Sequence, residues 1–213
     1  MKKILIVGLV ILLGGGFFLF NPHPQIKNAD TAAGPIVCFG DSLTAGVGAV
    51  SDQDYPAQLS RLLGVEVINA GISGETTAQG LARVDTVLAF RPGIAIVILG
   101  GNDLRKGVSR DSAFRNLRRI VELLQEAGAL VVLGGIDIPL FSKGYDAGYR
   151  ELAQSSGSVL IPNVFAGIWG RVELMSDQIH PNSLGYGVMA GMVAEAVRPF
   201  LEVTSRPRII SDH

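Results

Sequence analysis

The sequence predicts an α/β protein in which a central parallel sheet lies between two layers of helices. Apolar runs of strand length recur along the chain, and they are continuous rather than alternating, which is typical of parallel strands covered on both faces. Segments with helical spacing of apolar residues lie between these runs. Because strand and helix alternate to the end of the chain, we expect an open three-layer α/β/α sandwich.

The expected strands share an apolar run bounded by glycine or polar residues, and they cover residues 36–39, 65–69, 94–99, 129–133 and 159–161. The expected helices have an apolar face, and they cover residues 77–90, 109–127, 145–154 and 184–201. Pro92 and Gly128 mark the ends of the first two helices. After subtraction of the N-terminal leader, about 180 residues remain, which suits one domain with its own core.

The N-terminal segment is expected to be an export signal peptide or a membrane anchor rather than part of the fold. Lys2 and Lys3 precede an unbroken apolar run over residues 4–20. This run of about 17 residues is at the short edge of membrane-spanning length. The small-residue cleavage candidate Thr31-Ala32-Ala33 lies far beyond the run, which favours an uncleaved anchor with the remainder of the chain outside the cytoplasm.

The expected organisation is therefore a leader at 1–20, a spacer at 21–34, the domain at 35–203 and a loose tail at 204–213. The net charge of −1 offers no basic surface for nucleic acid. The single cysteine, Cys38, excludes an internal disulfide. His23 lies in the spacer and His213 is the last residue, so His180 alone cannot provide a zinc site and no metal is expected.

Chemically useful residues follow several of the expected strands. Ser42 follows the first strand, glycines within residues 69–74 follow the second, and Asn102 follows the third. Asp177 and His180 are three residues apart, a spacing that allows a carboxylate to orient an imidazole. Each of these stretches alone is also ordinary turn or helix-capping sequence. Together they offer a nucleophile, a base, a group that orients the base and oxyanion donors, which is the set that acyl transfer needs.

Four sequence blocks in register resemble the SGNH (GDSL) hydrolase family over nearly all of the chain after residue 35. They are Gly40-Asp41-Ser42-Leu43, Asn69-Ala70-Gly71, Gly100-Gly101-Asn102-Asp103 and Asp177-Gln178-Ile179-His180-Pro181-Asn182. The chain looks most similar to the bacterial branch that contains the multifunctional thioesterase, lysophospholipase and arylesterase. A G-x-S-x-G elbow, the mark of the ordinary α/β-hydrolases, is missing around Ser42.

The resemblance implies a flavodoxin-like fold and a cofactor-independent esterase acting on small-molecule or lipid esters or thioesters. It implies Ser42 as the nucleophile, His180 as the base and Asp177 as the partner of the base. The implied oxyanion hole consists of the backbone N–H groups of Ser42 and Gly71 and the side chain of Asn102.

An acyl pocket is expected beside Ser42. Residues 136–141 form a strand-end loop with large apolar side chains, and the expected lining residues are Val108, Pro139, Leu140, Phe141 and Ile179. Leu140 and Phe141 could instead close the core beneath the loop. Two other functions remain open at this stage: a carbohydrate O-deacetylase on the same scaffold, and a catalytically silent, tethered binding module.

Overall fold

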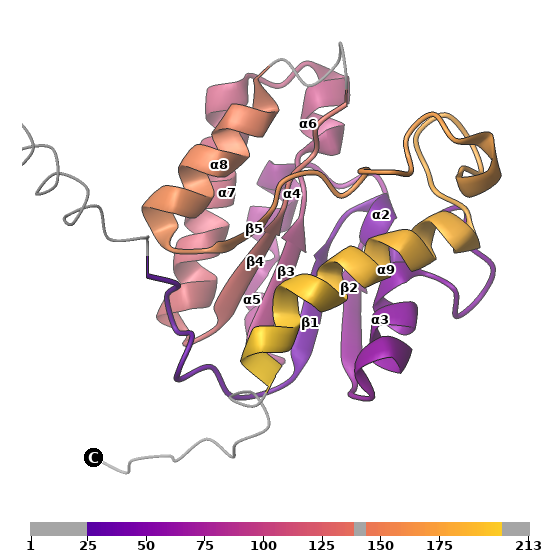
Figure 1. Ribbon diagram of the computed structural model, residues 1–213. Helices are drawn as coiled ribbons and strands as arrows, with labels where there is room; N and C mark the ends of the chain where they lie inside the picture. The colour runs from indigo at the N-terminus through magenta and orange to yellow at the C-terminus, as the bar shows by residue number, and fades with distance from the viewer. Residues whose placement is uncertain (1–24, 139–143, 202–213) are drawn as a thin grey trace, which may run out of the picture.

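Parallel strands form the centre of the domain, in the order β2-β1-β3-β4-β5 (Figure 1). The computed structural model describes residues 25–138 and 144–201. The strands are β1 (Ile36–Gly40), β2 (Val67–Gly71), β3 (Ile94–Ile98), β4 (Leu130–Gly134) and β5 (Val159–Ile161), and every pair is parallel. Strand β2 lies on one side of β1, and β3, β4 and β5 follow on the other side. Such a sheet leaves a crevice at the carboxyl ends of the strands, at the point where the strand order reverses.

Two layers of helices cover the sheet (Figure 1). Helices α3 (Tyr55–Leu63) and α9 (Ser183–Val197) pack together on one face. The other face carries α4 (Thr77–Ala82), α5 (Val84–Leu88), α7 (Arg110–Glu126) and α8 (Tyr145–Ser156). The predicted three-layer α/β/α architecture is therefore confirmed.

The core lies on both faces of the three central strands. Every residue of β1, β3 and β4 is buried, whereas β2 at the edge is mostly half-buried. Full burial of a Val, Leu, Ile or Phe side chain contributes about 1.5–3 kcal/mol. The continuous apolar runs that predicted these strands therefore supply much of the stability that fixes the sheet.

Several elements differ from the sequence prediction. The expected helix at 77–90 is interrupted at Arg83, which separates α4 from α5. Helix α3 was not predicted, although Asp54 caps its first turn by accepting from the Ala57 N–H at 2.9 Å and Pro56 stands in that turn. The closing helix passes into a 3-10 turn at η2 (Arg198–Phe200), where Pro199 has no N–H to continue the α-helical pattern.

The described chain begins with a segment that packs at the amino ends of the strands. The Asn28 side chain donates to the carbonyls of Gln125 and Ala129, each at 2.9 Å, and Ala32 is fully buried. Part of the stretch expected to be a spacer thus contacts the domain. Among the described helices, none has the length and apolar character to cross a membrane. The apolar run at 4–20 and the tail at 204–213 lie outside the described residues.

Candidate active site

Ser42 lies just past the carboxyl end of β1, at the first position of the short helix α2 (Ser42–Ala45). Asp41 caps this helix, because its Oδ1 accepts from the Leu43 N–H at 3.1 Å. A Cβ at Gly40 would collide with the Thr44 side chain and the Ile98 carbonyl, so glycine is required where the strand turns into the helix. This tight connection places the Ser42 hydroxyl at the crevice side of the sheet.

His180 and Asp177 reach Ser42 from the loop that precedes α9. His180 Nε2 lies 3.0 Å from Ser42 Oγ, and His180 Nδ1 lies 2.7 Å from Asp177 Oδ2. With the Nδ1 proton facing the carboxylate, Nε2 carries the free electron pair that can accept the serine proton. Ser42 and His180 are 138 positions apart in the sequence, and the fold brings them into contact.

Asp177 is held by its own loop. Its Oδ1 accepts from the backbone N–H groups of Ile179 and His180, each at 2.8 Å, while Oδ2 faces the imidazole. The hydrogen bond with His180, followed by the one from the Ile179 N–H, lowers the pKa of Asp177 to about 2. The carboxylate is therefore ionised at neutral pH and can accept a hydrogen bond from His180 Nδ1.

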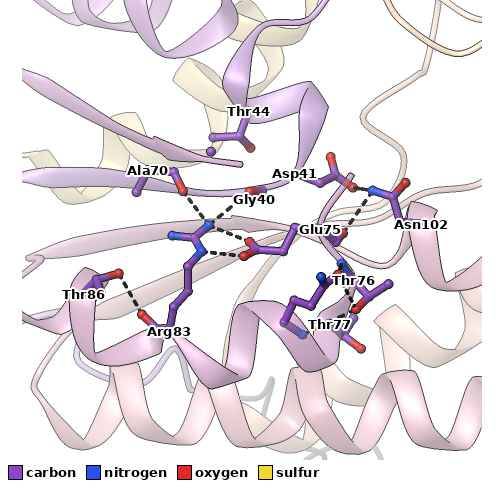
Figure 2. A network of polar contacts seen from close by, with 12 residues as sticks. Gly40, Asp41, Thr44, Ala70, Glu75, Thr76, Thr77, Arg83, Thr86 and Asn102 are labelled. Atoms are coloured by element: carbon purple, nitrogen blue, oxygen red, sulfur yellow. Dashed lines mark hydrogen bonds and ion pairs between the residues drawn. The ribbon is translucent and has the colours of Figure 1, made fainter. Parts of the chain in front are cut away.

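Asn102 lies on α6 (Gly101–Lys106), a short helix that was not predicted. Its Nδ2 donates to Asp41 Oδ2 at 3.1 Å and to the Glu75 carbonyl at 3.0 Å (Figure 2). Its Oδ1 accepts from Arg105 at 3.2 Å. Because both ends of the amide are engaged, the orientation of Asn102 is fixed and its donor group lies on the side of Asp41 and Ser42.

Asp41 is the second carboxylate beside Ser42, and it is buried. Desolvation raises its pKa to about 6, although hydrogen bonds from Leu43 and Asn102 and the nearby His180 act in the other direction. The side chain thus gives up its proton less readily than an ordinary aspartate. It supports the site by capping α2 and by accepting from Asn102.

Gly71 corrects one expectation. It is the last residue of β2, its N–H donates to Asn69 Oδ1 at 2.9 Å, and it is absent from the lining of the cavity beside Ser42. A Cβ there would collide with the backbone of Ala45, so this glycine allows α2 to approach β2 closely. The structure does not bring Gly71 to the site as an oxyanion donor.

Gly74 is the alternative backbone donor in the same stretch, and like Gly71 it is absent from the lining of the cavity. It has φ of 80° in the turn after β2, and its carbonyl accepts from Lys106 Nζ on α6 at 3.1 Å. The next carbonyl, that of Glu75, accepts from Asn102. Within the described parts of the chain, the Gly74 N–H donates to no acceptor. In the sequence, Gly74 differs from Gly71 only in lying farther beyond the apolar run of the strand.

A cavity of about 930 Å³ opens beside Ser42. Its polar residues gather around Ser42, His180 and Asn102, and the remainder of its lining is largely apolar. The rings of Phe165 and Trp169 meet edge to face with their centroids 5.4 Å apart. The apolar lining consists of Leu43, Leu104, Ile136, Ile138, Phe165, Trp169, Val172, Met175 and Ile179.

Of the residues expected to line an acyl pocket, Ile179 lines the cavity and Val108 is not among its lining residues. The Val108 N–H bonds the Asp103 carbonyl at the carboxyl end of α6. Pro139, Leu140 and Phe141 lie outside the described residues. Ile136 and Ile138, from the apolar loop singled out in the sequence, also line the cavity. Phe165, Trp169, Val172 and Met175 were missed, since residues 164–175 follow β5 without strand or helix periodicity. No cluster of three metal-ligating side chains occurs in residues 25–138 and 144–201.

The model of the GDSL-like Lipase/Acylhydrolase family matches residues 38–188. The chain belongs to this family. It is 33% identical over 162 residues to Esterase TesA of Pseudomonas aeruginosa, covering 70% of this chain and 81% of that one. It is 31% identical over 179 residues to Thioesterase 1/protease 1/lysophospholipase L1 of Escherichia coli K12, covering 80% and 86%.

The fold is also similar to that of a solved structure of this family. The crystal structure of TesA superposes with a TM-score of 0.74 at 29% identity, over 78% of this chain and 99% of that one. Together with the family match, this likeness identifies the chain as a carboxylic ester hydrolase of the SGNH (GDSL) type, and the expectation from the sequence is confirmed. A catalytically silent binding module is not supported.

Proposed function

We propose that Ser42, His180 and Asp177 hydrolyse esters or thioesters through an acyl-enzyme. Ser42 Oγ attacks the carbonyl carbon while His180 takes the hydroxyl proton, and Asp177 stabilises the imidazolium. The C–O or C–S bond then breaks and His180 protonates the leaving group. Water attacks the acyl-enzyme by the reverse route and releases the acid. The observation that carries this proposal is the unbroken series of contacts from Ser42 Oγ through the imidazole to Asp177.

The oxyanion donors in this proposal are the Ser42 N–H, the Asn102 amide and the Gly74 N–H. Asn102 supports the proposal because its amide is buried, oriented at both ends and beside Asp41. Its Nδ2 donates two hydrogen bonds, to the Glu75 carbonyl at 3.0 Å and to Asp41 Oδ2 at 3.1 Å. One of these hydrogen bonds must therefore be replaced by a bond to the substrate oxygen. The bond that remains and the one from Arg105 to Oδ1 keep the amide oriented when negative charge develops.

The proposed substrates carry an acyl chain longer than acetyl. The support is the apolar lining of the cavity of about 930 Å³, which is near the upper end of ordinary small-molecule pockets at about 300–1,000 Å³. The names of the relatives point in the same direction, since they include a thioesterase, a lysophospholipase and an esterase. Arylesterase, lysophospholipase and acyl-thioesterase activities are all within this proposal.

A chain-length series tests the substrate class. Aryl esters and acyl thioesters from two to ten carbons are compared by kcat/KM with the full-length protein. If the cavity takes the acyl chain, each added methylene contributes up to about 0.8 kcal/mol, or nearly fourfold in kcat/KM, until the space is full. A preference for acetyl esters, with no gain from longer chains, would instead favour the O-deacetylase.

The proposed location is outside the cytoplasm, with residues 1–20 as a membrane anchor. Lys2, Lys3 and the apolar run that follows support both the anchor and its orientation. Ala32 and Ala33 are buried in the domain, which argues against release of the chain by cleavage after Ala33. Membrane fractionation and N-terminal sequencing of the mature protein test this. A soluble product that begins after the apolar run would contradict the anchor.

A further inference from the structure

A buried ion pair lies behind the site, where the proposed mechanism does not use it. Arg83 donates through Nε to Glu75 Oε1 and through a terminal nitrogen to Glu75 Oε2, both at 2.6 Å. The side chains are 17% and 6% exposed, respectively. A bidentate arginine–carboxylate contact of this kind fixes the geometry of both partners. The Glu75 side chain is therefore held rigidly.

Arg83 also joins the ends of two strands. The same terminal nitrogen donates to the Ala70 carbonyl at 2.9 Å and reaches the Gly40 carbonyl at 3.4 Å. The guanidinium carbon lies 4.6 Å from the centroid of the Phe39 ring. Gly40 directly precedes Asp41 and Ser42, so Arg83 contacts the carboxyl end of β1 at the point where the chain turns toward the nucleophile (Figure 2).

Glu75 connects the ion pair to the proposed oxyanion donor. Its backbone carbonyl accepts from Asn102 Nδ2 at 3.0 Å, while its side chain is bound to Arg83 (Figure 2). Arg83 lies where α4 ends and α5 begins, with φ of −118° and ψ of 13°. This interruption of the helix accompanies an arginine side chain that points into the protein rather than into solvent.

We infer that Glu75 and Arg83 are positioning residues for the reaction, which hold the Asn102 amide in place beside the developing oxyanion. This inference rests on the proposed role of Asn102 as an oxyanion donor. Neither residue is among those that line the cavity. A misplacement of about 1 Å in a catalytic group can lower the rate by about 10²-fold, so loss of the pair should act on kcat more than on KM.

The experiment compares Arg83→Met, Arg83→Lys and Glu75→Gln in the full-length protein, at a temperature below the Tm of every variant. We expect Arg83→Met to lower kcat by about 10- to 100-fold with KM changed by less than about threefold. Arg83→Lys keeps the charge but cannot form the bidentate contact, so it should recover only part of kcat. Val87→Ala is the matched control, because Val87 is fully buried on α5 and lies outside the network.

Val87→Ala should lower Tm while kcat at the assay temperature stays within about twofold of the parent. If it lowers kcat as much as Arg83→Met does, the ion pair only stabilises the fold and the inference is overturned. The same conclusion follows if a folded Arg83→Met variant keeps the parent kcat. Should Arg83→Met fail to fold, Glu75→Gln, which retains the size of the side chain and one acceptor, takes its place in each comparison.

A double-mutant cycle with Asn102→Ala separates the inference from the proposed function. If the ion pair acts through Asn102, then Arg83→Met should lower kcat by less than about threefold in the Asn102→Ala background. Equal factors in both backgrounds would overturn the positioning role and leave the oxyanion role of Asn102 standing. If Asn102→Ala alone leaves kcat unchanged, the oxyanion role fails and the inference fails with it.

Discussion

On the histidine side of Ser42, Asp177 is 52% exposed and receives its backbone hydrogen bonds from residues two and three positions along the chain. On the amide side, Asn102 is 7% exposed and donates to residues 27 and 61 positions away. The first arrangement is built by one loop, and the second only by the folded sheet. A change on the histidine side should therefore leave the fold intact, whereas a change on the amide side should affect both the site and its surroundings.

The carboxylates on the two sides also respond oppositely to pH. The lowered pKa of Asp177, about 2, means that its contribution to stability is present above about pH 4 and is lost as the pH falls toward 2. The raised pKa of Asp41, about 6, means that the native state holds a proton that the unfolded state releases near pH 4. Stability from Asp41 therefore decreases as the pH rises from about 4 to 6.

The largest effect should come from Ser42→Ala. Loss of the nucleophile should lower kcat by about 10⁴- to 10⁶-fold, because the remaining groups can only bind the substrate and stabilise the oxyanion. The hydroxyl bonds only His180 among the described residues, so Tm should change little. Steady-state kinetics and thermal unfolding check this. Retention of more than a few per cent of the parent kcat by the folded variant would reassign the nucleophile.

Asn102→Ala should have the next largest effect on activity. Removal of one oxyanion donor lowers kcat by about 10²- to 10³-fold with a smaller change in KM. In contrast to Ser42→Ala, it should also lower Tm, because Asp41 and the Glu75 carbonyl lose a buried donor. The ratio of the effects on kcat and KM is the measurement that matters. An effect on KM alone would make Asn102 a substrate-binding residue.

Asp41→Asn tests the pH response of the buried side. The variant lacks the ionisation that Asp41 undergoes at about pH 6. The free energy of unfolding of the variant minus that of the parent should therefore increase by up to about 3 kcal/mol as the pH rises from 4 to 7. Urea unfolding at several pH values measures this difference. Asp146→Asn, at a half-buried carboxylate whose pKa is lowered by Arg150, should show no such gain.

The smallest effect should separate Ile179 from Val108, which are two of the five residues proposed from the sequence for the acyl pocket. Ile179→Ala removes apolar surface that lines the cavity, so the ratio of kcat/KM for an eight-carbon ester to that for acetate should fall by about threefold. Val108→Ala serves as the control and should leave the ratio unchanged, because Val108 is not among the residues that line the cavity. Equal changes in the two variants would mean that the acyl chain does not lie along Ile179.

The sequence by itself determined the sheet, the family and the histidine side of the site. Continuous apolar runs can be covered only by helices on both faces, so the strands and layers followed from composition and spacing. Asp177 and His180 form their contact within one loop, so a spacing of three residues was enough to predict it. Ser42 was predicted from its place directly after a strand.

Only the tertiary structure decided that the Gly71 N–H is already bonded, where the helix at 77–90 breaks and what lines the cavity. Gly71 and Gly74 are the same residue type, but Gly71 ends β2 with its N–H bonded to Asn69, whereas Gly74 lies in the following turn and its N–H donates to no acceptor among the described residues. Arg83 continues a helical pattern in the sequence, yet its guanidinium bonds carbonyls from two neighbouring strands. Such contacts depend on which chain segments become neighbours when the sheet forms, and local spacing carries no information about them.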